Sequence, residues 1–318
     1  MAASTFAEGG TATVADSLAR LSGGALNWLG HNLDFFNPYS AGAQLSGYWK
    51  AKAALELRLL HYCWEGLYPA DGRRADFDDL VRTLWQLPDF QRLVTSRPDH
   101  PAYYALIYAA LAPDGIDQAL RDATLAILQA EGYLSGAGQS ALLRLQTRYF
   151  ADKAGFEHEI EPYEELIEQS ILVKLPATRP VTIQDAYSIA HASFYLSDYG
   201  GKPTGLAPDR LAIAVRLVSR MLNYCAIQDM WDLAAELVIT LSCLGVDPVS
   251  SPSGAAGIRG LARAQLPSGA LPGRSAAQQA DESASPADFF NRAYHTTLMA
   301  ALIPFIASRG GCSPRADL

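Results

Sequence analysis

The chain has few cysteines and few charged residues for its length. Its four cysteines lie far apart in 318 residues and form no Cys-x-x-Cys pair, so neither a zinc ribbon nor a disulfide framework is indicated. A reducing compartment fits such cysteine usage best. Charged residues make up 18% of the chain, against about 25% in an average domain. So few charges in a long helical chain favour helices that are buried on more than one face.

Clustered basic residues, targeting segments and membrane-spanning runs are absent as well. The formal net charge of −8 argues against nucleic acid or an anionic membrane as the main partner, because both bind clustered Lys and Arg. Residues 1–10 contain no basic residue and no apolar run, which argues against a signal peptide. The longest charge-free apolar runs, near 103–113 and 293–308, are too short or too broken by proline to cross a bilayer. We expect a soluble, cytoplasmic protein without nucleic-acid or membrane partners.

Helical periodicity dominates the sequence. In residues 49–64, leucines and tryptophans alternate with Lys, Glu and Arg in the pattern of a largely buried helix. Similar patterns predict helices at 77–86, 102–111, 117–132, 140–154, 163–172, 182–199, 208–223 and 224–244. No stretch shows strand alternation bounded by hairpin turns. The sequence therefore predicts an all-α fold of antiparallel helix pairs, in a single domain over residues 1–318.

Residues 246–287 differ from the rest of the chain. They are rich in Ser, Gly, Ala and Pro, with one short helical candidate at 258–265. Loops of this length inside a compact domain are usually functional or disordered. We therefore predict a long insertion here, whose second part, residues 273–286, is mobile at the surface.

The segment Leu261–Pro304 suggests an architecture. A predicted helix ends in Gln265, a turn with Gly269 follows, and a new helix is predicted to begin near Tyr294. This pattern resembles the helix, Gln-x-x-x-Gly turn and helix units of α/α-toroid proteins, which include terpene cyclases, protein prenyltransferase subunits and lanthionine cyclases. The resemblance implies a barrel of helices around a central cavity. It also implies that Gln and Gly shape the turn, and that an aromatic residue, His and Thr begin the next inner helix.

A second resemblance rests on the segment Asp185–Gly200 together with Tyr294–Thr297. The two segments are similar to an uncharacterised, mainly actinobacterial helical family of natural-product gene clusters. This implies a role in specialised metabolism, with a peptide of the lanthionine type or another secondary-metabolite precursor as substrate, and other biosynthetic enzymes as partners. The resemblance supplies no established catalytic residues.

Candidate site residues lie on the predicted helix 182–199. Tyr187, His191, Tyr195 and Asp198 follow at i, i+4, i+8 and i+11, so they share one face. A histidine and a carboxylate on such a face could form an acid/base pair that lines a cavity. The alternative is that they pack in the core, with Asp198 closing the helix. We take His191 and Asp198 as candidate catalytic residues, and Tyr187 and Tyr195 as candidate substrate-binding residues.

His295 is the third candidate catalytic residue, with its neighbour Tyr294 as a candidate for substrate binding. Both lie at the predicted start of an inner helix, where the cavity of a toroid opens. A zinc ion would be chemically sensible if His61, Cys63 and His191 converged on His295. However, the Cys-His pair that holds zinc in lanthionine cyclases is missing here, which disfavours zinc. No metal ligand is assigned, and the cofactor stays open.

Carboxylates recur on the predicted helix 224–244. Cys225, Asp229, Asp232 and Glu236 follow at i, i+4, i+7 and i+11. Three carboxylates on one face could bind a divalent cation or hold a protonated acid, and a solvated helix face is the alternative. We take Asp229 and Asp232 as candidates for substrate binding.

Several function classes can be weighed against these patterns. GxSxG, P-loop, GxGxxG and HExxH motifs are absent, which removes the commonest hydrolase, nucleotide-binding and metalloprotease interpretations. We expect an enzyme of specialised metabolism that cyclises or otherwise modifies a precursor in a helical cavity. A non-catalytic module that binds a precursor peptide or a partner enzyme is the alternative. A terpene-type cyclase is disfavoured, because neither DDxxD nor DxDD occurs.

Overall fold

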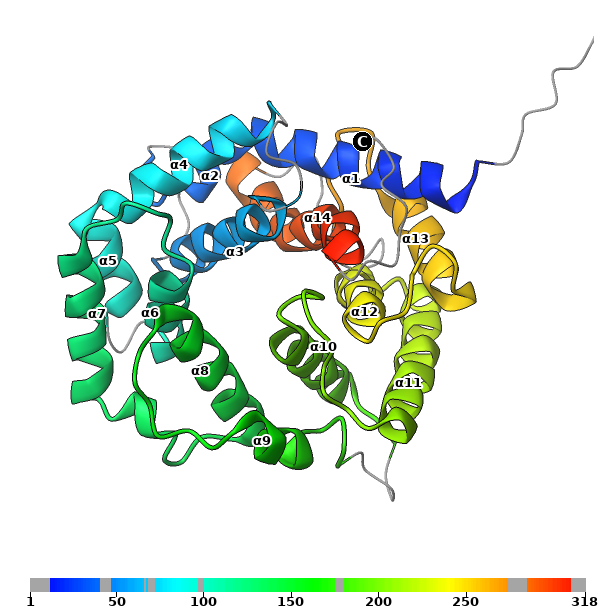
Figure 1. Ribbon diagram of the computed structural model, residues 1–318. Helices are drawn as coiled ribbons and strands as arrows, with labels where there is room; N and C mark the ends of the chain where they lie inside the picture. Colours follow the sequence, from blue (N-terminus) through cyan, green and yellow to red (C-terminus); the bar gives the residue numbers. More distant parts are fainter. Residues whose placement is uncertain are drawn as a thin grey trace, which may run out of the picture.

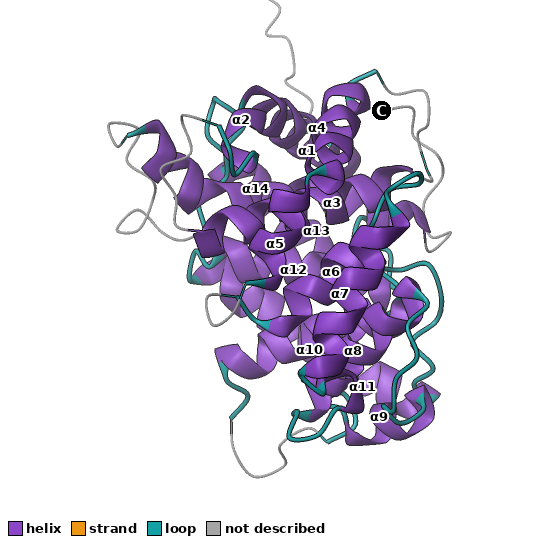
Figure 2. Ribbon diagram, turned by 90° about the vertical axis from the view of Figure 1, so that its left-hand side faces the viewer, coloured by secondary structure: helices purple, strands orange, loops and turns teal. Residues whose placement is uncertain are grey.

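The described part of the chain is entirely helical. A computed structural model describes residues 12–40, 47–65, 67, 72–96, 100–174, 180–273 and 285–309. These residues form fourteen α-helices and one short 3₁₀ helix, with no strand among them, as the side view shows (Figure 2). The predicted all-α class is therefore confirmed. Among these helices, none is both long enough and apolar enough to span a membrane.

Six inner helices form a closed ring. Each packs on the next, and the last returns to the first (Figure 1). They are α3 (Gly47–Glu65), α6 (Ala102–Ala110), α8 (Ala141–Ala154), α10 (Ile183–Ser197), α12 (Trp231–Cys243) and α14 (Pro286–Arg309). In α12 every residue from Leu233 to Cys243 is buried, as expected for a helix that is surrounded on all sides. Inner helices of this kind account for the low charge of the sequence.

The remaining helices lie outside this ring, so the chain alternates between inner and outer positions (Figure 1). They are α1 (Val14–His31), α2 (Leu33–Phe36), α4 (Arg74–Gln86), α5 (Pro88–Thr95), α7 (Gln118–Ala130), α9 (Tyr163–Gln169), α11 (Pro208–Ile227) and α13 (Pro252–Ala264). Outer helices bury one face only: in α7 just Thr124 and Leu128 are buried. The arrangement is compatible with the predicted α/α toroid.

Inner helices run parallel to one another. Lys52, early in α3, lies 3.4 Å from the hydroxyl of Tyr294 in α14, and Cys63, late in α3, lies 3.8 Å from Arg309 at the end of α14. Residues in the N-terminal half of α10 likewise contact residues in the N-terminal half of α12. Residues near the C-terminal end of α8 contact the C-terminal end of α10. The barrel therefore has an N-terminal end and a C-terminal end, named after these helices.

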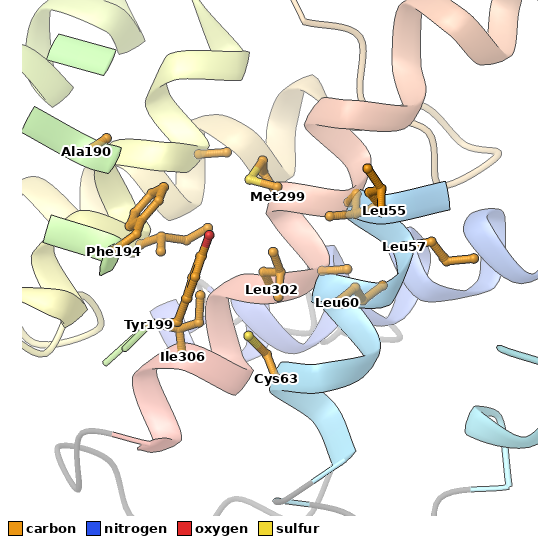
Figure 3. Packing of buried hydrophobic residues seen from close by; sticks show 14 of the residues in the cluster. Leu55, Leu57, Leu60, Cys63, Ala190, Phe194, Tyr199, Met299, Leu302 and Ile306 are labelled. Carbon is orange, nitrogen blue, oxygen red and sulfur yellow. The ribbon is translucent and has the colours of Figure 1, made fainter. Parts of the chain in front are cut away.

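Apolar side chains fill the barrel between α3, α10 and α14. Tyr199, Leu302 and Ile306 are buried there and lie close together (Figure 3). Removing a side chain of this size from a close-packed core costs about 2–5 kcal/mol. This packing supports the wall of the central cavity that is described below.

Two helix boundaries differ from the prediction, and both matter for the site. Helices α11 and α12 are separated by Gln228–Met230, where Asp229 has a φ of +50°. The predicted stripe of Cys225, Asp229, Asp232 and Glu236 is therefore broken, because Cys225 belongs to α11 and Asp229 to the turn. Helix α14 begins at Pro286, so His295 lies in its third turn and not at its start.

The predicted loop at 246–287 contains a full helix. Helix α13 covers Pro252–Ala264, where only residues 258–265 were predicted to be helical. Its glycines are packing positions: a Cβ atom on Gly257 would come within 3.0 Å of Leu222 and Val238, so α13 can approach α11 and α12 closely. Of the predicted mobile part, residues 274–284 lie outside the described residues.

The predicted Gln-x-x-x-Gly turn is present after α13. The Gln265 side-chain amide donates hydrogen bonds to the carbonyls of Gly269 and Leu21, both at 2.9 Å. Gly269 has a φ of +94°, and a Cβ atom there would lie 2.2 Å from the carbonyl oxygen of Gly24 in α1. The turn therefore ties the end of α13 to α1, and only glycine fits at its closest point.

Candidate active site in the central cavity

A cavity of about 250 Å³ lies inside the ring, and all six inner helices contribute to its wall. Most of the wall is aromatic or aliphatic, with Tyr103, Phe150, Phe194 and Tyr195 on one side. Five lining residues are charged or have an imidazole ring: Lys52, Glu56, His191, Glu236 and His295. They come from α3, α10, α12 and α14, and the contacts below place them toward the N-terminal end of the barrel.

His295 is surrounded by carboxylates. Its Nδ1 atom lies 3.1 Å from Oε2 of Glu56, and its Nε2 atom lies 3.4 Å from both Oε1 of Glu236 and Oδ1 of Asp232. The other oxygen of Glu56 accepts a hydrogen bond of 2.6 Å from Lys52. We call Lys52, Glu56, Asp232, Glu236 and His295 the His295 cluster.

The charges of the cluster support one another. Burial alone would lower the pKa of His295, but the charge of Glu56 and hydrogen bonds to Glu236 and Glu56 raise it to about 10. Burial alone would raise the pKa of Glu56, but His295 and Lys52 lower it to about 2. At neutral pH, His295 is therefore a cation and Glu56 an anion.

Glu236 lies between the two histidines of the cavity. Its side chain is only 3% exposed, and its Oε2 atom has no hydrogen-bond partner in the described part of the chain. The Nε2 atom of His191 lies 3.7 Å from Oε2. The His191 side chain is 40% exposed and lies beside the rings of Phe194 and Tyr195. His191 is thus a cavity group with a buried carboxylate behind it.

Asp232 connects the cluster to the outside. Its Oδ2 atom accepts a hydrogen bond of 2.6 Å from the Tyr187 hydroxyl, and its Oδ1 atom accepts one of 3.4 Å from Thr296. A second hollow of about 430 Å³ shares Lys52, Asp232 and His295 with the cluster and opens outward. The cluster therefore lies between the enclosed cavity and an open mouth.

Asp198 does not join the two histidines, so the three predicted catalytic residues do not meet in one site. It caps α10 in a left-handed conformation and accepts a hydrogen bond of 2.7 Å from Tyr149. It also pairs with Lys153 at 3.2 Å and with Arg309 at 3.4 Å. Arg309 is fourteen positions beyond His295 in α14, about 21 Å at the rise of an α-helix. Asp198 therefore belongs to the C-terminal end of the barrel.

The tyrosines predicted to bind substrate lie near the cavity, whereas Asp229 does not. Tyr195 lines the wall, and burial raises its pKa well above the usual range. Tyr187 donates to Asp232, and Tyr294 lies 3.4 Å from Lys52. Asp229 is exposed in the turn before α12, which does not support its predicted contact with substrate.

The zinc ligands considered from the sequence do not converge. His61 is buried beside Arg58, which lies 2.7 Å from its Nδ1 atom, and beside Asp78, 3.4 Å from its Nε2 atom. Cys63 contacts Arg309 at the C-terminal end. Only His191 and His295 of that set flank a common residue, Glu236.

Sequence patterns missed two members of the cluster, Lys52 and Glu56. They are four residues apart on α3 and form an ion pair, which is the usual pattern of a solvated helix face. Their signal was the place of this pair on a helix that the sequence predicted to be largely buried, in a chain with few charges.

Comparisons with known proteins place the chain in a family. No curated protein and no solved structure matches it. A family model described as "Domain of unknown function (DUF6895)" matches residues 22–304, which is well over half of the sequence and includes the whole His295 cluster. The chain therefore belongs to the DUF6895 family.

Proposed function

We propose that this chain is an enzyme that modifies or cyclises the end of a peptide or of another metabolite precursor by proton transfer. The observation that carries the proposal is the polarity of the cavity. Its wall is largely apolar and aromatic, and its charged groups gather at the end that adjoins an open mouth. A cavity of this kind binds an apolar group and presents its polar end to acid/base residues.

The size of the cavity limits what can enter. Its volume of about 250 Å³ lies just below the range of about 300–1,000 Å³ that is usual for small-ligand sites. A whole peptide does not fit. A terminal residue, or a small aromatic or aliphatic group on a longer precursor, does fit and leaves the rest of the precursor in the mouth.

His191 is the residue that we assign to proton transfer. Its ring faces the cavity, and Glu236 lies behind it with the Oε2 to Nε2 distance of 3.7 Å. An imidazole that faces a cavity with a carboxylate close behind it is a typical arrangement for general acid/base catalysis. The fixed charges of the His295 cluster would stabilise charge that develops on the substrate, because they are held in place before the reaction.

The test is turnover of candidate precursors by wild-type protein and by His191→Ala. The candidate substrates are the peptides encoded by neighbouring genes and the metabolites made by the enzymes that those genes encode. The measurement is the mass of the product and the consumption of thiol groups. His31→Ala is the matched control, because His31 is exposed at the end of α1, outside the ring. We expect no product with His191→Ala and full activity with the control. Equal turnover by both variants would show that His191 does not transfer the proton.

A further inference from the structure

Three potential metal ligands meet at the N-terminal end of the barrel. Asp232 and Glu236 are four residues apart on α12, so they share one face of that helix, and His295 faces them from α14. One carboxylate oxygen of each and the Nε2 atom of His295 all lie within 4.8 Å of one another. The sequence had considered His295 with other zinc ligands, and Asp232 and Glu236 in a separate carboxylate stripe, and the structure brings these three residues together.

The distances suit a small divalent ion. Zn²⁺ binds His nitrogen and carboxylate oxygen at about 2.0–2.2 Å with tetrahedral geometry, which separates neighbouring ligand atoms by about 3.3–3.6 Å. The Nε2 atom of His295 lies 3.4 Å from each of the two carboxylate oxygens. Two of the three ligand separations therefore already match a tetrahedral site, and rotation of a carboxylate adjusts the third.

Neighbouring side chains hold two of the three ligands, His295 and Asp232, as they do in known metal sites. The Nδ1 atom of His295 faces Glu56 at 3.1 Å, which directs Nε2 toward Asp232 and Glu236. Asp232 is itself held by hydrogen bonds from Tyr187 and Thr296. Carboxylates behind a ligating histidine and hydrogen bonds to a ligating carboxylate are typical of the outer shell of metal centres.

An independent observation comes from Glu236. Its side chain is almost fully buried, and while Oε1 faces His295, the second oxygen, Oε2, lies 3.7 Å from Nε2 of His191 and has no hydrogen-bond partner among the described residues. Buried polar atoms nearly always have a partner, and an exception calls for an explanation such as a bound ion. A cation held by Glu236 compensates for the burial of this carboxylate.

The balance of charge in the His295 cluster also favours a bound cation. The three carboxylates of the cluster and Lys52 together carry a charge of −2 beside a neutral His295. One divalent ion bound there brings the cluster to neutrality. Because an imidazole is among the ligands, Zn²⁺ is favoured over Mg²⁺ and Ca²⁺, which prefer oxygen ligands only.

We propose that Asp232, Glu236 and His295 bind one Zn²⁺ ion, with a free coordination position. Three protein ligands and one open position are typical of catalytic zinc, where the ion polarises a substrate oxygen or lowers the pKa of a bound water. The site goes beyond the proposed proton transfer by His191 and does not depend on it.

Direct metal binding tests the site. The full chain is stripped with a chelator and titrated with Zn²⁺ by calorimetry, and Co²⁺ is added in parallel for its visible absorption spectrum. We expect one ion per chain, and binding at least about 100-fold weaker in His295→Ala and Asp232→Asn. Asp229→Asn is the matched control, because this carboxylate is exposed three positions before Asp232, and it leaves the affinity unchanged.

A second variant keeps the test open if His295→Ala does not fold. Glu56→Gln leaves all three ligands in place and removes the carboxylate behind His295, which is expected to weaken Zn²⁺ binding by about 10–100-fold. Absence of stoichiometric binding, or equal affinity in wild-type protein, Asp232→Asn and Glu56→Gln, would overturn the proposal. Zinc binding without turnover of any precursor would contradict the proposed enzyme function and leave the metal site standing.

Discussion

The turn between α13 and α14 gives the sharpest stability prediction. Gly269 and Gly245 both have positive φ angles, +94° and +76°. A Cβ atom on Gly269 would lie 2.2 Å from the carbonyl oxygen of Gly24, whereas one on Gly245 would meet nothing within 4 Å. The two alanine variants therefore differ chiefly in the clash with α1, because the free-energy cost of the left-handed backbone is similar at both positions.

The magnitudes follow from these contacts. A left-handed conformation costs a non-glycine residue about 1–2 kcal/mol, which is the whole effect expected for Gly245→Ala. Gly269→Ala also pushes the turn away from α1, where the Gln265 amide makes two hydrogen bonds, each worth about 1 kcal/mol. We expect a total loss of about 3–4 kcal/mol for Gly269→Ala.

Urea unfolding followed by circular dichroism measures the difference. Gly269→Ala should lower the unfolding midpoint clearly more than Gly245→Ala does, with the same slope in both variants. Gln265→Ala, which removes only the side-chain bonds, should fall between the two. Equal midpoints for the two glycine variants would refute the close approach of the turn to α1.

Three further outcomes are expected. Burial and the charge of Arg58 lower the pKa of His61 to about 4 from 6.5, so the unfolded chain alone binds this proton between those pH values. The unfolding free energy should therefore fall by about 3 kcal/mol as pH drops through that window, and His61→Gln should lose this part of the dependence. Asp198→Asn keeps the left-handed cap but weakens the ion pairs with Lys153 and Arg309, so it should lower stability by about 2 kcal/mol and leave Zn²⁺ affinity unchanged. Ile239→Trp fills part of the cavity, which should abolish product formation at a stability cost of about 1–3 kcal/mol, and thermal unfolding beside the turnover assay checks both.

The sequence predicted the class of fold and most helices because periodic burial of apolar residues is a local signal. The boundary between α11 and α12 was predicted at 223/224 and lies at 228–230, because no glycine or proline marks it. Asp229 takes the positive φ instead, which few non-glycine residues do. Only the second half of helix α13 was predicted, because its glycines, such as Gly257, serve close helix packing, and only tertiary contacts reveal that use. The Gln-x-x-x-Gly turn was recognisable because its hydrogen bonds are largely local.

The site was predictable in part. His191 and His295 were singled out, and both lie in the cavity on either side of Glu236. Asp198 was grouped with His191 because both lie on one face of α10, but they are nearly two turns apart along the helix, and that distance takes Asp198 to the other end of the barrel. Glu56 meets His295 across 239 positions of sequence, a juxtaposition that only the closed ring creates.

The parallel course of the inner helices has a consequence for any molecule in the cavity. The dipoles of parallel helices add, so the N-terminal end of the barrel is electropositive in its backbone and the C-terminal end electronegative. Charged side chains follow this field: Asp185 and Asp232 lie in first turns, and Lys153 and Arg309 in last turns. The two ends of the barrel therefore differ in their charged side chains, and a bound molecule with separated charges meets carboxylates near one end and cations near the other.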